Sequence, residues 1–211
     1  MAPLPRLYPI LDTEKLARRN FPVLMAAEAM LEAGARILQL RHKSLWSRGV
    51  FEQADYVGRL CRHFGAQWMI NDRADVAALL DAGVHLGQDD LAPADARKVV
   101  GEARPIGLST HNEAQLRAAA MEPAEYVALG PVFGTRSKRN PDPEVGVENL
   151  RAWRALTAGP LVAIGGIRRD RAREVIAAGA DAVAVISDLL PEDMSKKKLR
   201  ERVEEWLKLL S

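Results

Sequence analysis

The chain has 211 residues, of which 48% are hydrophobic and 27% charged, proportions typical of a folded globular domain and unlike those of disordered or fibrous proteins. Its 30 lysines and arginines nearly balance 28 acidic residues, for a net charge of +2, which provides no basic face for a nucleic acid. The single cysteine, Cys61, excludes an intramolecular disulfide and multi-cysteine zinc sites. The sequence shows no secretion signal and no apolar run long enough to cross a membrane. We therefore expect a cytosolic protein.

Short strand-like runs alternate with longer helix-like runs along the whole chain. The predicted strands cover residues 7–11, 37–40, 67–70, 84–86, 105–108, 126–129, 161–164 and 182–186. The predicted helices cover residues 21–33, 51–64, 74–81, 92–100, 114–120, 147–156 and 171–178, and a closing helix aligns Leu199, Val203, Trp206 or Leu207, and Leu210. This order predicts a single-domain α/β fold over residues 1–211, a (β/α)8 TIM barrel, with a doubly wound open sheet as the alternative.

A tripeptide with a central glycine recurs between predicted helices and strands. The three copies are Ala33-Gly34-Ala35, Ala82-Gly83-Val84 and Ala178-Gly179-Ala180. Glycine tolerates the left-handed backbone that closes a helix, so we expect each of these glycines to end the helix before it.

The positions just past the predicted strands are nearly all polar residues or glycines. They are Arg41, Lys43, Asn71, Asp72, Gln88, Asp89, Asp90, Ser109, Thr110, His111, the loop 130–138, Gly165, Gly166 and Ser187. Because the carboxyl ends of barrel strands share one rim, these groups should converge although they are scattered in sequence.

The charges at this rim divide into two sets. Arg41, Lys43 and Lys138, with the hydroxyls of Thr135 and Ser137, are typical of a pocket for phosphate or diphosphate. Asp72 and Asp90 beside them would repel such an anion unless a cation lies between, and two carboxylates with phosphate oxygens form the ligand shell that Mg²⁺ accepts. The two sets together predict a site for a magnesium-bound diphosphate.

Simpler interpretations stand beside this one. Asp72 and Asp90 could each cap the helix that follows, and Arg41 and Lys43 could pair with surface acids. His85 lies within a strand and is given no catalytic role, whereas a strand-end residue such as His111 suits either proton transfer or a structural hydrogen bond.

A second phosphate site is predicted near the last two strands. The Gly165-Gly166 pair follows an apolar strand and precedes a helix, so its backbone amides could approach an anion closely. The end of the eighth strand, Ile186-Ser187, supplies amides on the neighbouring loop, where barrels often hold a phosphate.

Seven segments resemble, in order, the thiamine-phosphate synthase family. They are Gln39-Leu40-Arg41-His42-Lys43, Ile70-Asn71-Asp72-Arg73, Val84-His85-Leu86-Gly87-Gln88-Asp89-Asp90, Gly107-Leu108-Ser109, Leu129-Gly130-Pro131-Val132-Phe133, Ala163-Ile164-Gly165-Gly166-Ile167 and Val185-Ile186-Ser187. The resemblance runs from Leu7 to about Leu190. It implies a (β/α)8 barrel that joins 4-amino-5-hydroxymethyl-2-methylpyrimidine diphosphate to 4-methyl-5-(2-phosphooxyethyl)thiazole and releases pyrophosphate.

The resemblance also implies a role for each matched position. The residues for the pyrimidine diphosphate would be Arg41, Lys43, Asn71 and Lys138, with Ser109 assisting the leaving group and Asp72 and Asp90 holding Mg²⁺. Gln39 would be a further substrate-binding residue. The residues for the thiazole phosphate would be Thr135, Ser137, Gly166, Ile186 and Ser187. Of these, Ser109, Lys138, Arg41 and Lys43 are the expected catalytic residues, and a homodimer is an expected assembly that no residue pattern requires.

The phosphate loop departs from the family's Pro-Thr-x-Thr-Lys pattern. It has Gly134 in place of proline and Ser137 in place of the second threonine. Glycine loosens such a loop, which affects the expected affinity for the thiazole phosphate.

Two other functions compete with a synthase. A sister family of thiazole tautomerases shares the barrel, the thiazole-phosphate pocket and a histidine that matches His111, but it transfers protons without a metal. An isomerase has no diphosphate to bind, so the argument against it is the set of retained residues Arg41, Lys43, Asn71, Asp72 and Asp90. A non-catalytic sensor of phosphate ligands on the same barrel is the other alternative.

Overall fold

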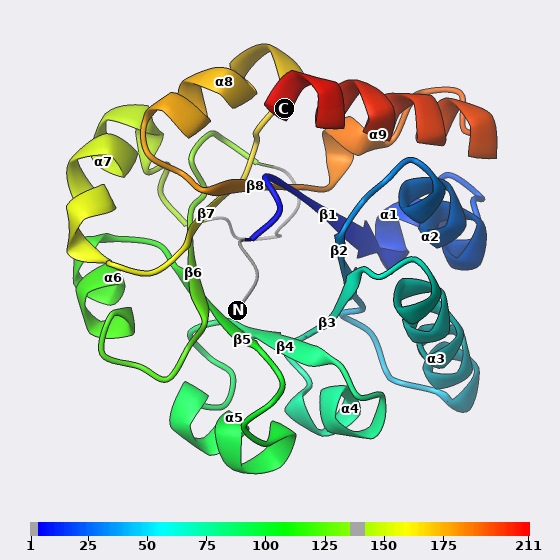
Figure 1. Ribbon diagram of the computed structural model, residues 1–211, viewed down its shortest axis with the longest axis horizontal. Coiled ribbons are helices and arrows are strands. Elements are labelled where there is room, and N and C mark those ends of the chain that lie inside the picture. Colours follow the sequence, from blue (N-terminus) through cyan, green and yellow to red (C-terminus); the bar gives the residue numbers. More distant parts are fainter. Residues whose placement is uncertain (1–3, 136–141) are drawn as a thin grey trace.

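A computed structural model describes residues 4–135 and 142–211 of the chain, and within them eight parallel strands close into a barrel (Figure 1). The strands are β1 (Leu7–Asp12), β2 (Ile37–Arg41), β3 (Gln67–Asn71), β4 (Gly83–Leu86), β5 (Ile106–Thr110), β6 (Tyr126–Leu129), β7 (Leu161–Ile164) and β8 (Ala182–Val185). Each strand pairs with the next in sequence, and β8 pairs with β1. The predicted barrel is therefore confirmed, and the open-sheet alternative is wrong.

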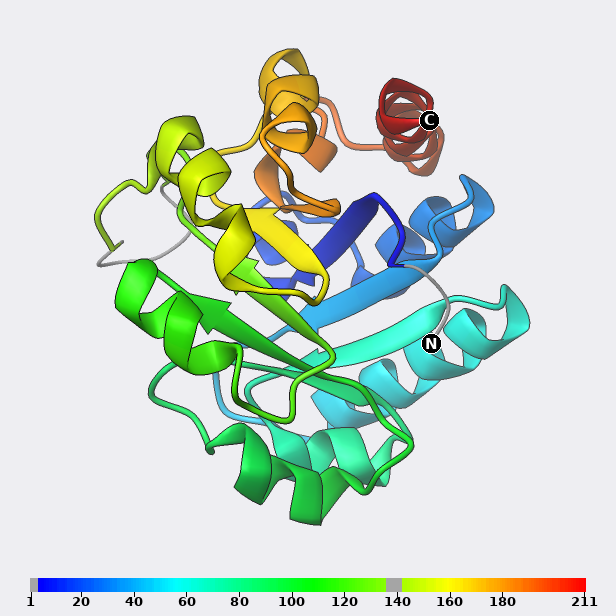
Figure 2. The same ribbon diagram turned by 60° about the vertical axis from the view of Figure 1, so that its left-hand side comes forward.

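Helices form a ring outside the strands (Figures 1 and 2). They are α1 (Thr13–Ala17), α2 (Val23–Glu32), α3 (Arg48–His63), α4 (Ala74–Leu79), α5 (Pro93–Val100), α6 (Glu113–Ala119), α7 (Gly146–Trp153), α8 (Arg169–Ala177) and α9 (Lys196–Leu210), with 3-10 helices η1 (Arg154–Leu156) and η2 (Ser187–Leu189). The eight strands and the predicted helices all form, with ends shifted by three residues or fewer. The sequence analysis missed α1 and η2, which are too short to show a helical period.

The glycine repeat closes a helix at two of its three positions. Gly34 and Gly179 have φ of +107° and +108°, the left-handed conformation that was expected. At the middle copy the prediction was wrong, because Gly83 opens β4 and the positive φ falls on Asp81, at 53°. Glycine is still needed at position 83, since a Cβ there would lie 2.5 Å from Sδ of Met69 and 2.7 Å from the carbonyl of Pro105.

Two apolar clusters hold the barrel together. The smaller fills the barrel interior and consists of Tyr8, Ile10, Ile37, Met69, Tyr126, Ala128, Val162, Ala182 and Ala184. The larger lies between the strands and the ring of helices and includes Cys61. Burial raises the pKa of the Cys61 thiol to about 12, so this cysteine is protonated and behaves as a small apolar side chain, as expected.

The closing helix α9 is anchored by Trp206, which settles the choice with Leu207 that the sequence left open. Trp206 is fully buried, and its Nε1 donates a hydrogen bond to Asp188 Oδ2 at 3.1 Å. Leu207 is only half-buried at the edge of the same core. The indole therefore ties α9 to η2 and to the end of the barrel wall.

We expect Trp206→Ala to lower the free energy of unfolding by about 3–5 kcal/mol, the usual cost of deleting a buried aromatic side chain. Leu207→Ala, on the neighbouring half-buried position, should cost less than half as much. Urea unfolding of both variants measures the difference. Equal losses would show that the indole is not the anchor of α9.

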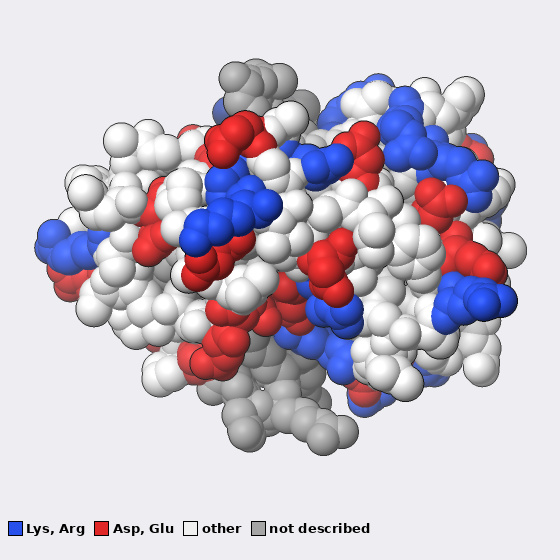
Figure 3. All heavy atoms as spheres, turned by 90° about the horizontal axis from the view of Figure 1, so that it is seen from below, with Lys and Arg blue, Asp and Glu red and all other residues white. Residues whose placement is uncertain are grey.

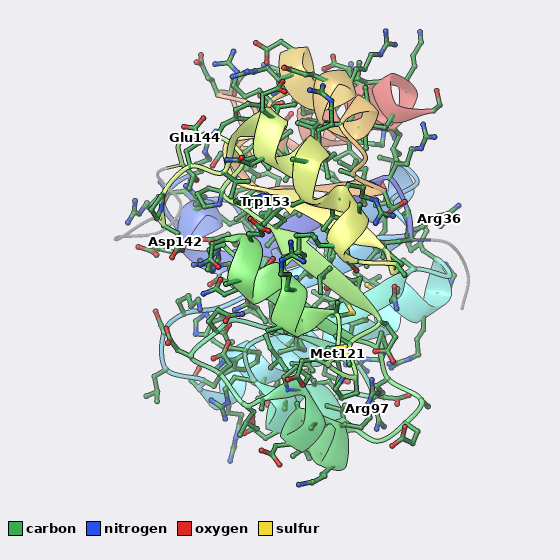
Figure 4. The ribbon with its side chains drawn as sticks, turned by 90° about the vertical axis from the view of Figure 1, so that its left-hand side faces the viewer. Arg36, Arg97, Met121, Asp142, Glu144 and Trp153 are labelled. Carbon is green, nitrogen blue, oxygen red and sulfur yellow. The ribbon has the colours of Figure 1, made fainter. Side chains whose placement is uncertain are left out.

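The barrel has two distinct ends. Figure 4 shows Arg36, which precedes β2, at one end, and Asp142 and Glu144, from the loop between β6 and α7, at the other. All strands run from the first end to the second because they are parallel. The second end is thus the carboxyl rim where the sequence places the polar residues.

Basic and acidic side chains are interspersed over the face shown in Figure 3, which agrees with the near-zero net charge. Among the helices described, none is both long and apolar enough to span a bilayer.

Candidate active site

A cavity of about 1340 Å³ opens at the carboxyl rim. Its walls include Gln39, Arg41, Lys43, Asn71, Asp72, Asp90, Ser109, Thr135, Gly166, Ile186 and Ser187, which are predicted site residues from seven of the eight strands and the loops after them. This volume exceeds the range usual for one small ligand, so two could be held together. Ser137 and Lys138, the remaining predicted site residues, lie outside the described residues.

Arg41 is held in place by an aspartate on the neighbouring strand. Arg41 Nη1 donates a hydrogen bond to Asp12 Oδ2 at 2.6 Å, and the Asp12 side chain is only 2% exposed. Asp12 Oδ1 also accepts from the backbone amide of Lys15 and so caps α1. A buried carboxylate fixed in this way orients the guanidinium, whose fork retains further donors for a ligand at the cavity wall.

Lys43 and Asp72 form an ion pair across the loops that follow β2 and β3. Lys43 Nζ lies 2.6 Å from Asp72 Oδ2. Lys43 therefore does pair with an acid, as the simpler interpretation expected. That acid is a residue of the predicted site, however, and not an unrelated surface acid. Asp72 also has a φ of +67°, a left-handed conformation that is uncommon for a residue with a side chain and is concentrated at functional positions.

Asp90 faces Asp72 from the loop after β4. Its Oδ2 accepts a hydrogen bond from the amide of Gly87 at 2.7 Å. Burial raises the pKa of Asp90, the Gly87 hydrogen bond lowers it, and the charge of the nearby Asp72 carboxylate raises it again. Two acids are thus held at close range in a partly buried site.

The capping interpretation of these two aspartates is wrong. The residue before α4 is Arg73 and the residue before α5 is Ala92, and neither helix has a side-chain cap. Asp72 and Asp90 are instead directed to the cavity and to each other.

The pair suits a hard divalent cation. Among the described residues, no three His, Cys, Asp or Glu side chains gather into a metal site. Proteins nevertheless commonly bind Mg²⁺ through only one or two carboxylates when a phosphate of the substrate supplies further oxygen ligands. Burial and, after it, the charge of Asp72 raise the pKa of Asp90, and a cation between the acids would relieve their repulsion.

Asn71 carries a hydrogen-bond donor that its neighbours leave unused. Its side chain is buried at the cavity wall, and Nδ2 finds no acceptor in the part of the chain that the structure describes. A buried amide without a partner costs about 1–3 kcal/mol, which an acceptor oxygen on a ligand would recover.

Ser109 lies at the end of β5 rather than after it, because the strand continues to Thr110 and not only to Leu108 as predicted. Its Oγ is 2.9 Å from Nε2 of His85. His85 is buried with both ring nitrogens hydrogen-bonded, as expected of an interior histidine. Gln39 is also buried, and its amide donates to Tyr8 Oη at 2.9 Å.

His111 lines the cavity and is tied to the β6–α7 loop. Its Nδ1 lies 2.5 Å from the carbonyl of Gly130, to which it donates, and its Nε2 lies 3.5 Å from Asp142 Oδ2. A structural hydrogen bond is therefore present, while the ring still faces the cavity.

The loops after β6, β7 and β8 meet at one side of the cavity. Gly165 and Gly166 have φ of +96° and +64°. A Cβ on Gly165 would lie 2.5 Å from Cα of Pro131, and one on Gly166 would lie 2.6 Å from the carbonyl of Gly134. The glycine pair is thus required by the packing of the β6–α7 loop, besides leaving its backbone open to a ligand.

Asp12 is the site residue that the sequence analysis missed. It directly follows the predicted end of the first strand, so the rule applied to the other seven strands would have found it. Its role could not be read from its position alone, because its partner lies 29 residues away.

Comparisons with known proteins agree on one family. Residues 7–189 match the family model described as "Thiamine monophosphate synthase". The chain is 44% identical to the thiamine-phosphate synthase of Koribacter versatilis over 98% of this chain and 96% of that protein, and 42% identical to that of Xanthobacter autotrophicus over 87% and 86%. The solved thiamine phosphate pyrophosphorylase from Pyrococcus furiosus superposes with a TM-score of 0.84 at 32% identity, covering 98% of this chain and 95% of that one.

Proposed function

The chain belongs to the thiamine monophosphate synthase family, and on that premise we propose that its rim cavity joins 4-amino-5-hydroxymethyl-2-methylpyrimidine diphosphate to 4-methyl-5-(2-phosphooxyethyl)thiazole. The products would be thiamine monophosphate and pyrophosphate. Family membership makes the chain a transferase. The substrates and the residues that hold them are the proposed part.

The observation that carries the proposal is the grouping of unlike charges at one wall of the cavity. Lys43 and Asp72 are paired at 2.6 Å, Asp90 faces Asp72, and the buried Asn71 amide beside them has no acceptor among the described residues. Cations and donors without the acids would suit any phosphate. The two acids in addition require a ligand that brings a cation, as a magnesium diphosphate does.

The reaction needs no protein nucleophile. The bond between the pyrimidine methylene carbon and the diphosphate oxygen breaks with its electron pair leaving on oxygen, and the thiazole nitrogen then donates its lone pair to the carbon cation. Arg41, Lys43 and Asn71 stabilise the negative charge that grows on the departing diphosphate. The cavity holds both substrates in line, which removes the entropy cost of bringing them together.

Asp72 and Asp90 would hold Mg²⁺, which when bound supplies positive charge to the diphosphate oxygens. The protein's own contribution is to hold both carboxylates in place. Lys43 pairs with Asp72, and the Gly87 amide donates a hydrogen bond to Asp90.

The thiazole phosphate would bind on the opposite side, near Gly166, Ile186 and Ser187. All three line the cavity at the ends of β7 and β8, the part of a barrel where backbone amides often bind phosphate. Thr135 lies at the same side, and its proposed partners Ser137 and Lys138 are outside the described residues.

Incubation of the purified chain with both substrates and Mg²⁺ tests the proposal, with product read as the fluorescence of oxidised thiamine phosphate. We expect product only when both substrates are present. Conversion of a thiazole-phosphate tautomer without coupling would indicate a tautomerase instead. Binding of both substrates without product would indicate a sensor, and either result would overturn the proposal.

A cytosolic location and a homodimer also stay predictions. The location follows from the cysteine usage and the missing secretion signal, whereas no residue pattern requires the homodimer. Cell fractionation and light scattering of the purified chain would test them.

A further inference from the structure

A chain of hydrogen bonds crosses the barrel interior and ends at the cavity. Gln39 Nε2 donates to Tyr8 Oη at 2.9 Å, Tyr8 Oη lies 2.9 Å from Tyr126 Oη, and Tyr126 Oη lies 2.9 Å from His85 Nδ1. The last bond joins His85 Nε2 to Ser109 Oγ, also at 2.9 Å. These five side chains come from β2, β1, β6, β4 and β5.

The direction of every bond follows from the amide at one end. The Gln39 NH₂ group can only donate, so the single proton of Tyr8 is left for Tyr126. Tyr126 accepts that bond and therefore gives its own proton to His85 Nδ1. A neutral imidazole that accepts at Nδ1 carries its proton on Nε2 and donates it to Ser109.

The two tyrosines in the middle of this hydrogen-bond series are shielded from solvent. Tyr8 and Tyr126 are 1% and 2% exposed, and burial raises the pKa of both phenols, so each keeps its proton. Their rings meet edge to face at 5.9 Å, and the Tyr126 ring stacks on His85 at 5.6 Å. Neither tyrosine is among the cavity-lining residues.

Gly107 makes the arrangement possible. In the strand register it pairs with His85 on one side and with Tyr126 on the other. A Cβ at position 107 would lie 2.1 Å from Cζ of Tyr126. Because Gly107 has no side chain, the Tyr126 phenol can cross β5 and hydrogen-bond to His85.

We propose that Tyr126 and Tyr8 are positioning residues that fix the Nε2–H tautomer of His85, so that Ser109 accepts from His85 and turns its own hydroxyl proton toward the diphosphate. The inference rests on the proposed function for the identity of the anion. The order of the hydrogen bonds does not depend on it.

The tautomer can be measured in the free protein. In ¹⁵N-histidine-labelled protein, long-range ¹H–¹⁵N correlation spectra distinguish Nε2–H from Nδ1–H, and His85→Gln identifies the signal among the four histidines. We expect Nε2–H in the wild type and a rise in Nδ1–H in Tyr126→Phe, which removes the donor to Nδ1. Tyr8→Phe should change the spectrum in the same direction if Tyr126→Phe does not fold.

Kinetics test the link to Ser109. We expect Tyr126→Phe to lower kcat about tenfold, as the loss of one oriented donor would, with little change in KM. In a Ser109→Ala background the same substitution should change kcat by less than about twofold, because the path it acts through is gone. Thr110→Val is the matched control, since it removes a buried hydroxyl whose partner within residues 4–135 and 142–211 is the carbonyl of Ala128.

The outcomes separate the two claims. A wild-type His85 with its proton on Nδ1, or equal losses from Tyr126→Phe with and without Ser109, would overturn this inference while leaving the synthase activity intact. A wild type that makes no product would overturn the proposed function. The tautomer measurement would then still test the directions of the hydrogen bonds, independently of any activity.

Discussion

Removal of Mg²⁺ with EDTA is expected to lower product formation at least about a thousandfold, the scale on which a bound cation stabilises a leaving phosphate. The physical reason is the pair of carboxylates at the cavity wall. Burial raises the pKa of Asp90, and the charge of Asp72, which faces it closely, raises that pKa further. A diphosphate placed beside them adds further negative charge, which a divalent cation between the acids and the diphosphate would offset.

The measurement is the rate of fluorescent product in metal-free buffer, in EDTA, and after Mg²⁺ is restored. EDTA already saturated with Mg²⁺ is the control, because the chelator is present but can no longer remove Mg²⁺ from the enzyme. Full activity in EDTA would show that Asp72 and Asp90 do not hold a required metal. It would leave the assignment of Arg41 and Lys43 to the diphosphate untouched.

Asp72→Asn is expected to lower kcat/KM by about a hundredfold to a thousandfold. Asparagine keeps the size of the side chain and tolerates the positive φ of this residue, 67°, so the loss should come from the missing charge. Alanine would add backbone strain to the same position. Lys43→Ala, which removes the other half of the 2.6 Å ion pair, should fall in the same range.

Asp75→Asn is the matched control for this prediction. Asp75 lies three residues further on, is exposed and pairs with Arg73 outside the cavity. It should keep near-wild-type activity, and both variants should unfold within about 1 kcal/mol of the wild type. An Asp72→Asn enzyme with normal turnover but altered stability would assign Asp72 to the fold rather than to the reaction.

The order of elements could be read from the sequence because each one has its own local signal. β6 and β7 have the predicted bounds, and α5, with barely two turns, begins one residue after the prediction. α1 has only five residues, so it shows no period, and its start is set by the Asp12 side chain. The end of β5 was placed too early because Ser109 and Thr110 look like loop residues, although pairing with β6 continues through both.

The glycines show a similar division. A glycine after a helical run predicted the left-handed turn at Gly34 and Gly179 because that conformation is a property of the local backbone. At Gly83 the same pattern had another cause, the close approach of Met69 in β3 and of Pro105 just before β5. Local sequence does not contain that contact.

The amino-acid sequence by itself determined that eight strands alternate with helices and that polar residues follow the strands, since hydrophobic period and strand ends are local properties. The barrel then brings those polar residues to one rim because parallel strands share a direction. Only the tertiary structure decided which groups pair there. Arg41 meets Asp12 across 29 residues, His85 meets Tyr126 across 41, and Tyr8 meets Tyr126 across 118, and no local pattern records contacts between residues so far apart.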